Sequence, residues 1–304
     1  MIVTVTLNPA IDKTCRVERL KHGNVNRMNR VERIAGGKGV NVTKILRQFD
    51  YPVKAIGFMA GTGGRFIEET LAKMGAECDF AYVDGDTRTS TNIIEADGTV
   101  TEILEPGFTV SQEEAERFID AFSKRIEGAK IVVFSGSLPI GVPRGIYRKL
   151  IEISKAQGCK TFLDTSGEAL CEGVEAAPYF VKPNLVELET YAGRELQHVE
   201  QHEIAECTKP MILNGIEKVV VTLGANGLVA VTEEETVYHD CYPVEVANTV
   251  GCGDTVVASY VMSELSGDDG KAAAKKASAL AAANAATSEN GYISKETYEK
   301  LLNS

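Results

Sequence analysis

Residues 111–134 read SQEEAERFIDAFSKRIEGAKIVVF, a helix pattern followed directly by a strand pattern. Ser111 and Glu114 have the spacing of a capping box, in which two residues satisfy each other's backbone N–H groups at a helix start. An apolar stripe with helical spacing follows them and leads into the continuous apolar run KIVVF at 130–134. A short strand that is apolar at every position is typical of a parallel sheet with helices on both faces.

The same helix-and-strand unit recurs along the chain. A helical stripe at 66–74 ends before Gly75, and Pro143 is placed to open another helix. The alternation predicts an α/β fold with a mainly parallel sheet. Ligands of such sheets bind beyond the carboxyl ends of the strands, so we expect functional residues in the loops after strands. The other predicted strands are Val53–Phe58, Lys160–Leu163, Tyr179–Val181, Lys218–Leu223 and Leu228–Val231.

Two segments, 12–34 and 87–104, do not follow this pattern. They carry β-branched residues in alternation, such as Thr89, Thr91 and Ile93, and neither contains a helix pattern. They predict extra strands, which form either a small sheet that covers a site as a lid or simple hairpins at the edge of the main sheet.

Composition excludes several classes of function. The 304 residues have a formal charge of −11, which argues against binding to nucleic acid or to an anionic membrane surface. No apolar run is long enough to span a membrane. Seven cysteines are scattered without a CxxC pair, and no secretion signal is evident, so we expect a cytoplasmic protein with reduced thiols.

The stretch NTVGCGD at 248–254 precedes the apolar run TVVASYVMSEL, which predicts a helix. Gly251 and Gly253 leave the preceding turn open to a ligand, and the backbone N–H groups at a helix start form an anion site. Asp254 could accept a proton from a hydroxyl that is being phosphorylated. Taken alone, the stretch fits equally well a glycine turn with an ordinary acid at the helix start.

Three glycines surround Lys38 in AGGKGVN at 35–41, ahead of another predicted helix. This is not a Walker A loop, which has the pattern GxxxxGK[ST]. Glycine lets the backbone approach a polar ligand closely, and Lys38 and Asn41 can hydrogen-bond hydroxyls or a phosphate. A flexible turn with a solvated lysine is the alternative.

Two further strand ends carry weaker patterns. Asn184 and Glu187 have the spacing of a capping box, which by itself is favoured over a role for Glu187 in holding hydrated magnesium. The stretch VTLGANG at 221–227 predicts either a hairpin turn or a loop against a nucleotide. His198 and His202, in HVEQH, lack the HExxH order of zinc sites, and we interpret them as surface residues.

Together and in this order, the motifs resemble those of the phosphofructokinase B family of the ribokinase superfamily. LNPAID at 7–12, GGKGVN at 36–41, SGSLP at 135–139, DTSGEAL at 164–170, VKPN at 181–184, VTLGANG and NTVGCGD span almost the whole chain. The branch that looks most similar contains 1-phosphofructokinases and tagatose-6-phosphate kinases. The resemblance implies a ribokinase-like, Rossmann-type three-layer α/β/α sandwich with a small β-sheet lid. Residues 1–11, 35–86 and 105–304 would form the kinase domain, and 12–34 and 87–104 the lid.

The resemblance also implies ATP and Mg²⁺ as cofactors and a role for each motif. Asp254 would be the catalytic base, and the amides of Gly251, Cys252 and Gly253 would form an anion hole for the transferred phosphoryl group. The sugar phosphate would be bound by Asp12, Gly36, Gly37, Lys38 and Asn41, with Arg88 and Arg27 at its existing phosphate. ATP would be bound by Lys182, Asn184, Glu187, Thr222, Gly224, Gly227 and Asn284, and Glu187 would also hold the metal indirectly, through water.

The reaction implied is phosphorylation of a ketohexose monophosphate to the 1,6-bisphosphate. TEILEPG at 101–107 and SGSLP look more similar to tagatose-6-phosphate kinases, so tagatose 6-phosphate is the preferred substrate and fructose 1-phosphate the alternative. A kinase for an unphosphorylated sugar and a non-catalytic sugar-binding regulator remain as other hypotheses. The resemblance further implies a homodimer joined through the lids. Cys252 stands where the family usually has Ala or Ser, and a thiol at a helix start is expected to have a low pKa.

Overall fold

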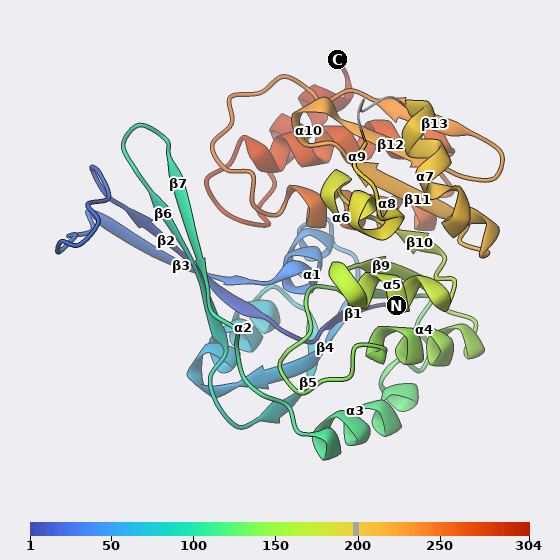
Figure 1. Ribbon diagram of the computed structural model, residues 1–304, viewed down its shortest axis with the longest axis horizontal. Coiled ribbons are helices and arrows are strands. Elements are labelled where there is room, and N and C mark those ends of the chain that lie inside the picture. Colours follow the sequence, from blue (N-terminus) through green and yellow to red (C-terminus); the bar gives the residue numbers. More distant parts are fainter. Residues whose placement is uncertain (197–200) are drawn as a thin grey trace.

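The computed structural model describes residues 1–196 and 201–304, and within these residues the chain forms two β-sheets (Figure 1). The large sheet has the order β13-β12-β11-β10-β9-β8-β1-β4-β5, and the small sheet has the order β3-β2-β6-β7. The strands of the large sheet are β1 (Ile2–Thr6), β4 (Val53–Ala60), β5 (Glu77–Val83), β8 (Ile131–Ser135), β9 (Lys160–Asp164), β10 (Phe180–Val181), β11 (Lys218–Thr222), β12 (Leu228–Val231) and β13 (Thr236–His239). Those of the small sheet are β2 (Ala10–Arg16), β3 (Arg30–Gly36), β6 (Arg88–Ile94) and β7 (Val100–Leu104).

The helices are α1 (Lys38–Gln48), α2 (Gly61–Lys73), α3 (Gln112–Arg125), α4 (Ile146–Ala156), α5 (Gly167–Glu175), α6 (Leu185–Ala192), α7 (Gln201–Leu213), α8 (Cys252–Ser266), α9 (Gly270–Ala285) and α10 (Lys295–Leu302). Two capping boxes start helices as their sequences predict, Ser111 with Glu114 at α3 and Asn184 with Glu187 at α6. The prediction for Pro143 is wrong in position, because Pro143 lies in the turn before α4. Its carbonyl accepts a hydrogen bond from the N–H of Ile146, the first residue of that helix.

The predicted mainly parallel sheet is confirmed, since every neighbouring pair from β5 across to β11 is parallel. Beyond β11, the strands β12 and β13 are antiparallel. A single 3₁₀ turn, Gly224–Asn226, joins β11 to β12, so the hairpin interpretation of VTLGANG is correct. Strand β13 was not predicted, because its sequence TVYH is short and only half buried and lacks the apolar run of the inner strands.

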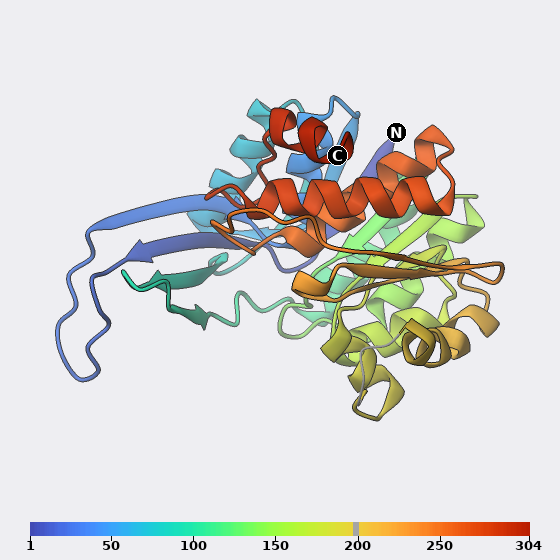
Figure 2. The same ribbon diagram turned by 90° about the horizontal axis from the view of Figure 1, so that it is seen from above.

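Helices cover both faces of the large sheet, which gives three layers (Figure 2). On one face, apolar residues of α1, α8 and α9 pack on the strands, including Ile45, Val257 and Leu280. On the other face the helices from α3 to α7 do so, with Phe118 of α3 and Tyr147 of α4 among the buried side chains. The α/β/α sandwich is therefore confirmed.

The small sheet projects from the body of the protein (Figures 1 and 2). It lies beside the carboxyl ends of the large sheet, because β2 follows β1 and β6 follows β5 after short connections. Strands β2 and β6 are parallel, with Asp12 opposite Ser90, so the two segments that lacked the helix-and-strand pattern pair with each other. Strand β2 begins at Ala10 and strand β3 ends at Gly36, so the two strands extend slightly beyond the predicted segment 12–34.

Among the described residues, no helix combines the length and the apolar character needed to cross a bilayer. His198 lies outside the described residues, and His202 is exposed on α7.

Candidate active site

Asp254 lies in the first turn of α8 and is buried, with 6% of its surface exposed. The helix begins because Gly251 adopts a left-handed backbone conformation, with φ of 85°, that few other residues tolerate. The Asn41 side chain in α1 donates a hydrogen bond of 2.8 Å to Oδ2 of Asp254. The pKa of Asp254 is raised to about 6, first by burial and then by the charge of Asp164, against the lowering effects of Lys38 and Asn41.

The amides of Gly251, Cys252 and Gly253 lie at the start of α8. The first intrahelical bond runs from the Thr255 N–H to the Gly251 carbonyl, so the N–H groups before it have no acceptor within the helix, and the Cys252 N–H makes only a long contact of 3.4 Å to the Thr249 carbonyl. Gly253 faces Lys182, because a Cβ atom added to Gly253 would lie 3.4 Å from Nζ of that lysine. The helix end and the lysine together make a positively charged place for a phosphate.

Asp164, at the carboxyl end of β9, organises the charges beside Asp254. It is fully buried, and its Oδ1 lies 2.8 Å from Nζ of Lys38 and 3.3 Å from Nζ of Lys182. Burial alone would raise the pKa of Asp164, but Lys182 and Lys38 hold it below its usual value. Lys38 also lies 3.6 Å from Oε1 of Glu187, which brings the GGKG loop and the NxxE capping box together.

Asp164 belongs to the DTSGEAL motif, which was not predicted to contribute a residue to the site. The signal was present, because a carboxylate directly after a buried parallel strand lies at the edge where ligands bind. Lys44 and Asn290 also adjoin the site, and their sequence contexts, a helix interior and a loop between helices, did not mark them.

Asp12, Gly36 and Gly37 meet where β2 and β3 join the large sheet. A Cβ atom at Gly36 would lie 2.1 Å from Oδ2 of Asp12, so only glycine leaves room for that carboxylate. Gly37 caps α1 with φ of 99°, which places Lys38 and Asn41 in its first turn. Burial raises the pKa of Asp12, against the lowering effects of a hydrogen bond from Asn290 and the charges of Lys44 and Arg88.

The two arginines predicted for the existing phosphate lie in different places. Arg88, the first residue of β6, has Nε 3.4 Å from the Asn8 carbonyl, and its charge acts on Asp12. Arg27 is exposed in the connection between β2 and β3, beyond the last paired residues Arg16 and Arg30. Within one protomer the structure therefore does not bring Arg27 to Asp12. The cause is that the hairpin carries residues 17–29 away from the large sheet.

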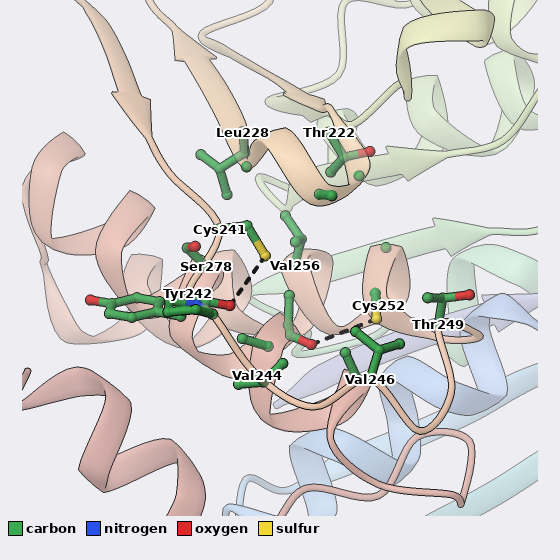
Figure 3. A pocket seen from close by; sticks show the side chains of 18 of the residues that line it. Thr222, Leu228, Cys241, Tyr242, Val244, Val246, Thr249, Cys252, Val256 and Ser278 are labelled. Atoms are coloured by element: carbon green, nitrogen blue, oxygen red, sulfur yellow. Dashed lines mark hydrogen bonds between the residues drawn. The ribbon is translucent and has the colours of Figure 1, made fainter.

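A cavity of about 590 Å³ opens beside the start of α8 (Figure 3). Four of the predicted nucleotide-binding residues line it, namely Asn184, Thr222, Gly224 and Gly227. Most of the remaining wall is apolar and includes Val246, Val256 and Ala281. The part of the wall from Cys241 to Val244, which connects β13 towards α8, was not anticipated because it carries no recognisable motif.

Asn284 of α9 contacts the glycine loop before α8. Its Nδ2 donates to the Val250 carbonyl at 3.0 Å and lies 3.4 Å from Sγ of Cys252. The thiol of Cys252 lines the cavity, but the expectation of a low pKa is wrong. Burial raises the pKa of Cys252, and the charges of Asp254 and Cys241 add to the increase, against the lowering effect of the bond from Asn284.

Comparison with known proteins agrees with this arrangement. The model of the pfkB family of carbohydrate kinases matches residues 5–297. Phosphofructokinase-2 from Escherichia coli, solved in complex with potassium, is 25% identical and superposes with a TM-score of 0.92 over 99% of this chain and 98% of that chain. A possible 1-phosphofructokinase from Thermotoga maritima is 28% identical, with a TM-score of 0.89 over 100% of this chain and 97% of that chain.

Arabidopsis thaliana ribokinase, solved with ribose and ATP, is 21% identical with a TM-score of 0.78 over 99% of this chain and 98% of that chain, and it shows the shared ribokinase-like fold alone. The family match covers nearly the whole chain, including every motif around Asp254. This chain therefore belongs to the pfkB family of carbohydrate kinases and is a sugar kinase, a phosphotransferase with an alcohol group as acceptor.

Proposed function

We propose that this kinase uses ATP to phosphorylate a ketohexose monophosphate to the 1,6-bisphosphate, with Asp254 as catalytic base. The observation that carries the proposal is the position of Asp254. Buried Lys44 feels the charges of both Asp12, which lies beside Arg88, and Asp254, while Cys252 and Gly253, directly before Asp254, line the apolar cavity. An acceptor bound at Asp12 and a donor bound in the cavity would meet at Asp254.

The cavity suits the nucleoside part of ATP. Its largely apolar wall suits the faces of a purine, and Gly224, with open space where a side chain would lie, allows close approach of the ribose. Thr222 and Asn184 supply polar groups at the end nearer the lysines. The phosphates would then extend along the start of α8 toward Lys182 and Lys38.

The carboxylates fit a hydrated magnesium ion. Oδ2 of Asp164 is buried and has no hydrogen-bond partner among the described residues. One oxygen of Glu187 caps α6 by accepting from the Asn184 N–H, while the other faces Lys38, so the capping role does not exclude a role at the metal. We assign Glu187, acting through water, with Asp164 beside it. Bound Mg²⁺ would neutralise charge on the ATP phosphates.

The transfer step uses the geometry around Asp254. The Asp254 carboxylate takes the proton of the sugar hydroxyl while the hydroxyl oxygen attacks the γ-phosphorus. The bond from the γ-phosphorus to the β-phosphate oxygen breaks, and ADP leaves with that electron pair. The amides of Gly251, Cys252 and Gly253 stabilise the charge on the phosphoryl oxygens. Because the pKa of Asp254 is about 6, most of it is ionised and able to act as a base near neutral pH.

One cation on the acceptor side favours a phosphorylated sugar. Arg88 lies beside Asp12, so an anionic acceptor would be attracted to it, whereas Lys38 pairs with Asp164 and Glu187 on the ATP side. Among such acceptors we place tagatose 6-phosphate first, on the similarity of TEILEPG and SGSLP to that branch. Fructose 1-phosphate is the second candidate, favoured by the likeness to the Thermotoga maritima protein.

The small sheet would act as a lid over the bound sugar. Asp12 and Arg88 are both carried on its strands at the end that joins the large sheet. Closure of a lid excludes water and so limits hydrolysis of ATP.

A strip of apolar side chains on the small sheet supports a homodimer joined through the lids. Val31 and Ile93 lie opposite Cys15, and Ile103 follows in the next row of the same face. Val31 is 45% exposed and Ile103 is 55% exposed. Val31→Glu should convert the dimer to a monomer in sedimentation, whereas Leu213→Glu on α7, at an exposed site elsewhere, should not.

The deciding experiment measures ADP release with Mg²⁺ and compares kcat/KM for tagatose 6-phosphate, fructose 6-phosphate, fructose 1-phosphate and free hexoses. A preference for a 6-phosphate places the existing phosphate at Arg88 and O1 at Asp254. A preference for fructose 1-phosphate reverses the sugar in the same site. Higher activity on free hexoses would refute the proposal of an anionic acceptor.

A further inference from the structure

Helix α1 holds the segment that connects α9 to α10. Gln48 donates from Nε2 to the Gly291 carbonyl at 2.7 Å, and its Oε1 accepts from the Ile293 N–H at 2.9 Å. One turn earlier, Nζ of Lys44 donates to the carbonyls of Asn290 and Ala35, the latter at 3.1 Å. The same helix that carries Lys38 and Asn41 into the site therefore fixes this distant segment.

Burying the ammonium group of Lys44 to make these bonds costs folding free energy. The side chain is 6% exposed, and no carboxylate forms an ion pair with it among the described residues. Burial lowers its pKa to about 8, although Asp12, Asp254 and Glu289 favour its charge. A buried ammonium that bonds only main-chain carbonyls is destabilising compared with an apolar side chain, which points to a role beyond packing.

The side chain of Asn290 joins two parts of the site, Asp12 and the glycine loop, while its main-chain carbonyl is bonded by Lys44. Its Nδ2 donates to Oδ2 of Asp12 at 2.9 Å, and its Oδ1 accepts from Nδ2 of Asn248. Asn290 is 3% exposed, so neither bond competes with bulk water. The acceptor side and the glycine loop before α8 thus share one amide.

Asn248 transmits this contact to the glycine loop. Its Oδ1 accepts from the Val250 N–H at 3.0 Å, and its own N–H donates to the Ala285 carbonyl at 3.1 Å. Val250 directly precedes Gly251, the residue whose left-handed conformation starts α8. A continuous chain of hydrogen bonds therefore runs from Asp12 through Asn290 and Asn248 to Val250, directly before the proposed anion hole.

We propose that Asn290 is a positioning residue that couples the acceptor carboxylate Asp12 to the glycine loop through Asn248, and that Lys44 holds Asn290 in place. The inference rests on the proposed function, because the groups that it aligns are those proposed to bind the sugar and the transferred phosphoryl group. A sugar hydroxyl bound to Asp12 would then affect the position of the backbone N–H groups proposed to bind the phosphoryl group.

The test compares three variants by their steady-state constants. Asn290→Ala should raise KM for the phosphosugar and lower kcat, each by roughly 10-fold, since a small misplacement of reacting groups has large effects on rate. KM for ATP should change less, because neither Asn290 nor Asp12 lines the cavity. Asn248→Ala should lower kcat with KM for the phosphosugar nearly unchanged. The double variant should have the kcat of Asn290→Ala alone, as expected for residues in one chain of bonds.

Gln48→Ala is the matched control, because it removes two hydrogen bonds to the same segment without touching Asp12 or Asn248. It should lower the melting temperature about as much as Asn290→Ala and leave the kinetic constants near those of the wild type. Lys44→Met should change KM and kcat in the same direction as Asn290→Ala. The positioning role would be overturned if Asn290→Ala and Gln48→Ala had equal kinetic constants. It would also be overturned if the loss of kcat in the double variant were the product of the two single losses. Either result would leave the proposed function standing. Absence of turnover by the wild-type protein on every sugar would instead refute the proposed function.

Discussion

Asn41 of α1 and Asp254 of α8 are joined by a hydrogen bond of 2.8 Å between two buried side chains, although 213 positions separate them in the chain. The Asn41 Nδ2 group donates, so the bond favours the ionised carboxylate. It also sets the direction in which the second oxygen of Asp254 faces. Two motifs that were separate in the sequence therefore form a single unit in the proposed active site.

Replacement of the proposed base gives the most direct prediction. Asp254→Asn keeps the size of the side chain but cannot accept the hydroxyl proton, so kcat should fall by roughly 100- to 10,000-fold. ADP release in the presence of the phosphosugar measures the loss. Binding of ATP, followed by titration calorimetry, should be nearly unchanged. Near wild-type turnover would remove Asp254 from the role of base.

The pH dependence of kcat/KM should report the pKa of Asp254. The carboxylate acts as a base only when ionised, so activity should rise with pH through about 6 and level off above it. The bond from Asn41 lowers that pKa, and Asn41→Ala should therefore move the acid limb to higher pH. Gln48→Ala, on the same helix but away from Asp254, should leave the limb in place. A limb that stays in place in Asn41→Ala as well would show that another group titrates.

The charge of Arg88 should matter for the acceptor and not for the donor. Arg88→Gln should raise KM for the phosphosugar by about 10-fold or more, the scale of a hydrogen bond between charged groups. Arg117→Gln serves as control, because Arg117 is exposed on α3, away from Asp12 and from the small sheet. Both variants should keep the wild-type KM for ATP. An unchanged KM for the phosphosugar in Arg88→Gln would contradict the assignment.

Cys252 should contribute its amide and not its thiol. Cys252→Ala should keep kcat within about twofold of the wild type, because the main-chain N–H at the start of α8 remains. Since burial raises the pKa of the thiol, alkylation by iodoacetamide near neutral pH should be slow compared with that of exposed Cys171. Mass spectrometry of both peptides would measure the two rates. Rapid labelling of Cys252 would contradict this reading.

Most of the fold could be predicted from the sequence, because inner parallel strands are largely apolar and several helices between them show an apolar stripe or, as at α3 and α6, a capping box. The run at 130–134 and the capping box at Ser111 are examples, and both are confirmed. Strand β13 could not be predicted, because an edge strand with one half-buried face lacks that signal.

The motifs indicated which residues meet near Asp254, but they did not predict the long-range hydrogen bonds between side chains. Asn290 lies in an ordinary loop, and nothing local shows that its amide reaches Asp12 on the other side of the fold. Arg27 could not be placed from the sequence either, because the sequence does not show how far the hairpin carries it from Asp12 within one protomer. Distance along a strand cannot be inferred from charge alone.

The parallel pairing of β2 with β6 has a consequence for the order of folding. All of β3, α1, β4, α2 and β5 lies between these strands in the chain, so their pairing closes a long loop. We expect the strands to align after β4 and β5 have joined the large sheet, so that the small sheet is among the last parts to form. Asp12 and Arg88 therefore meet late in folding. A sugar phosphate that contacts both would bind only the completed chain and should slow its unfolding.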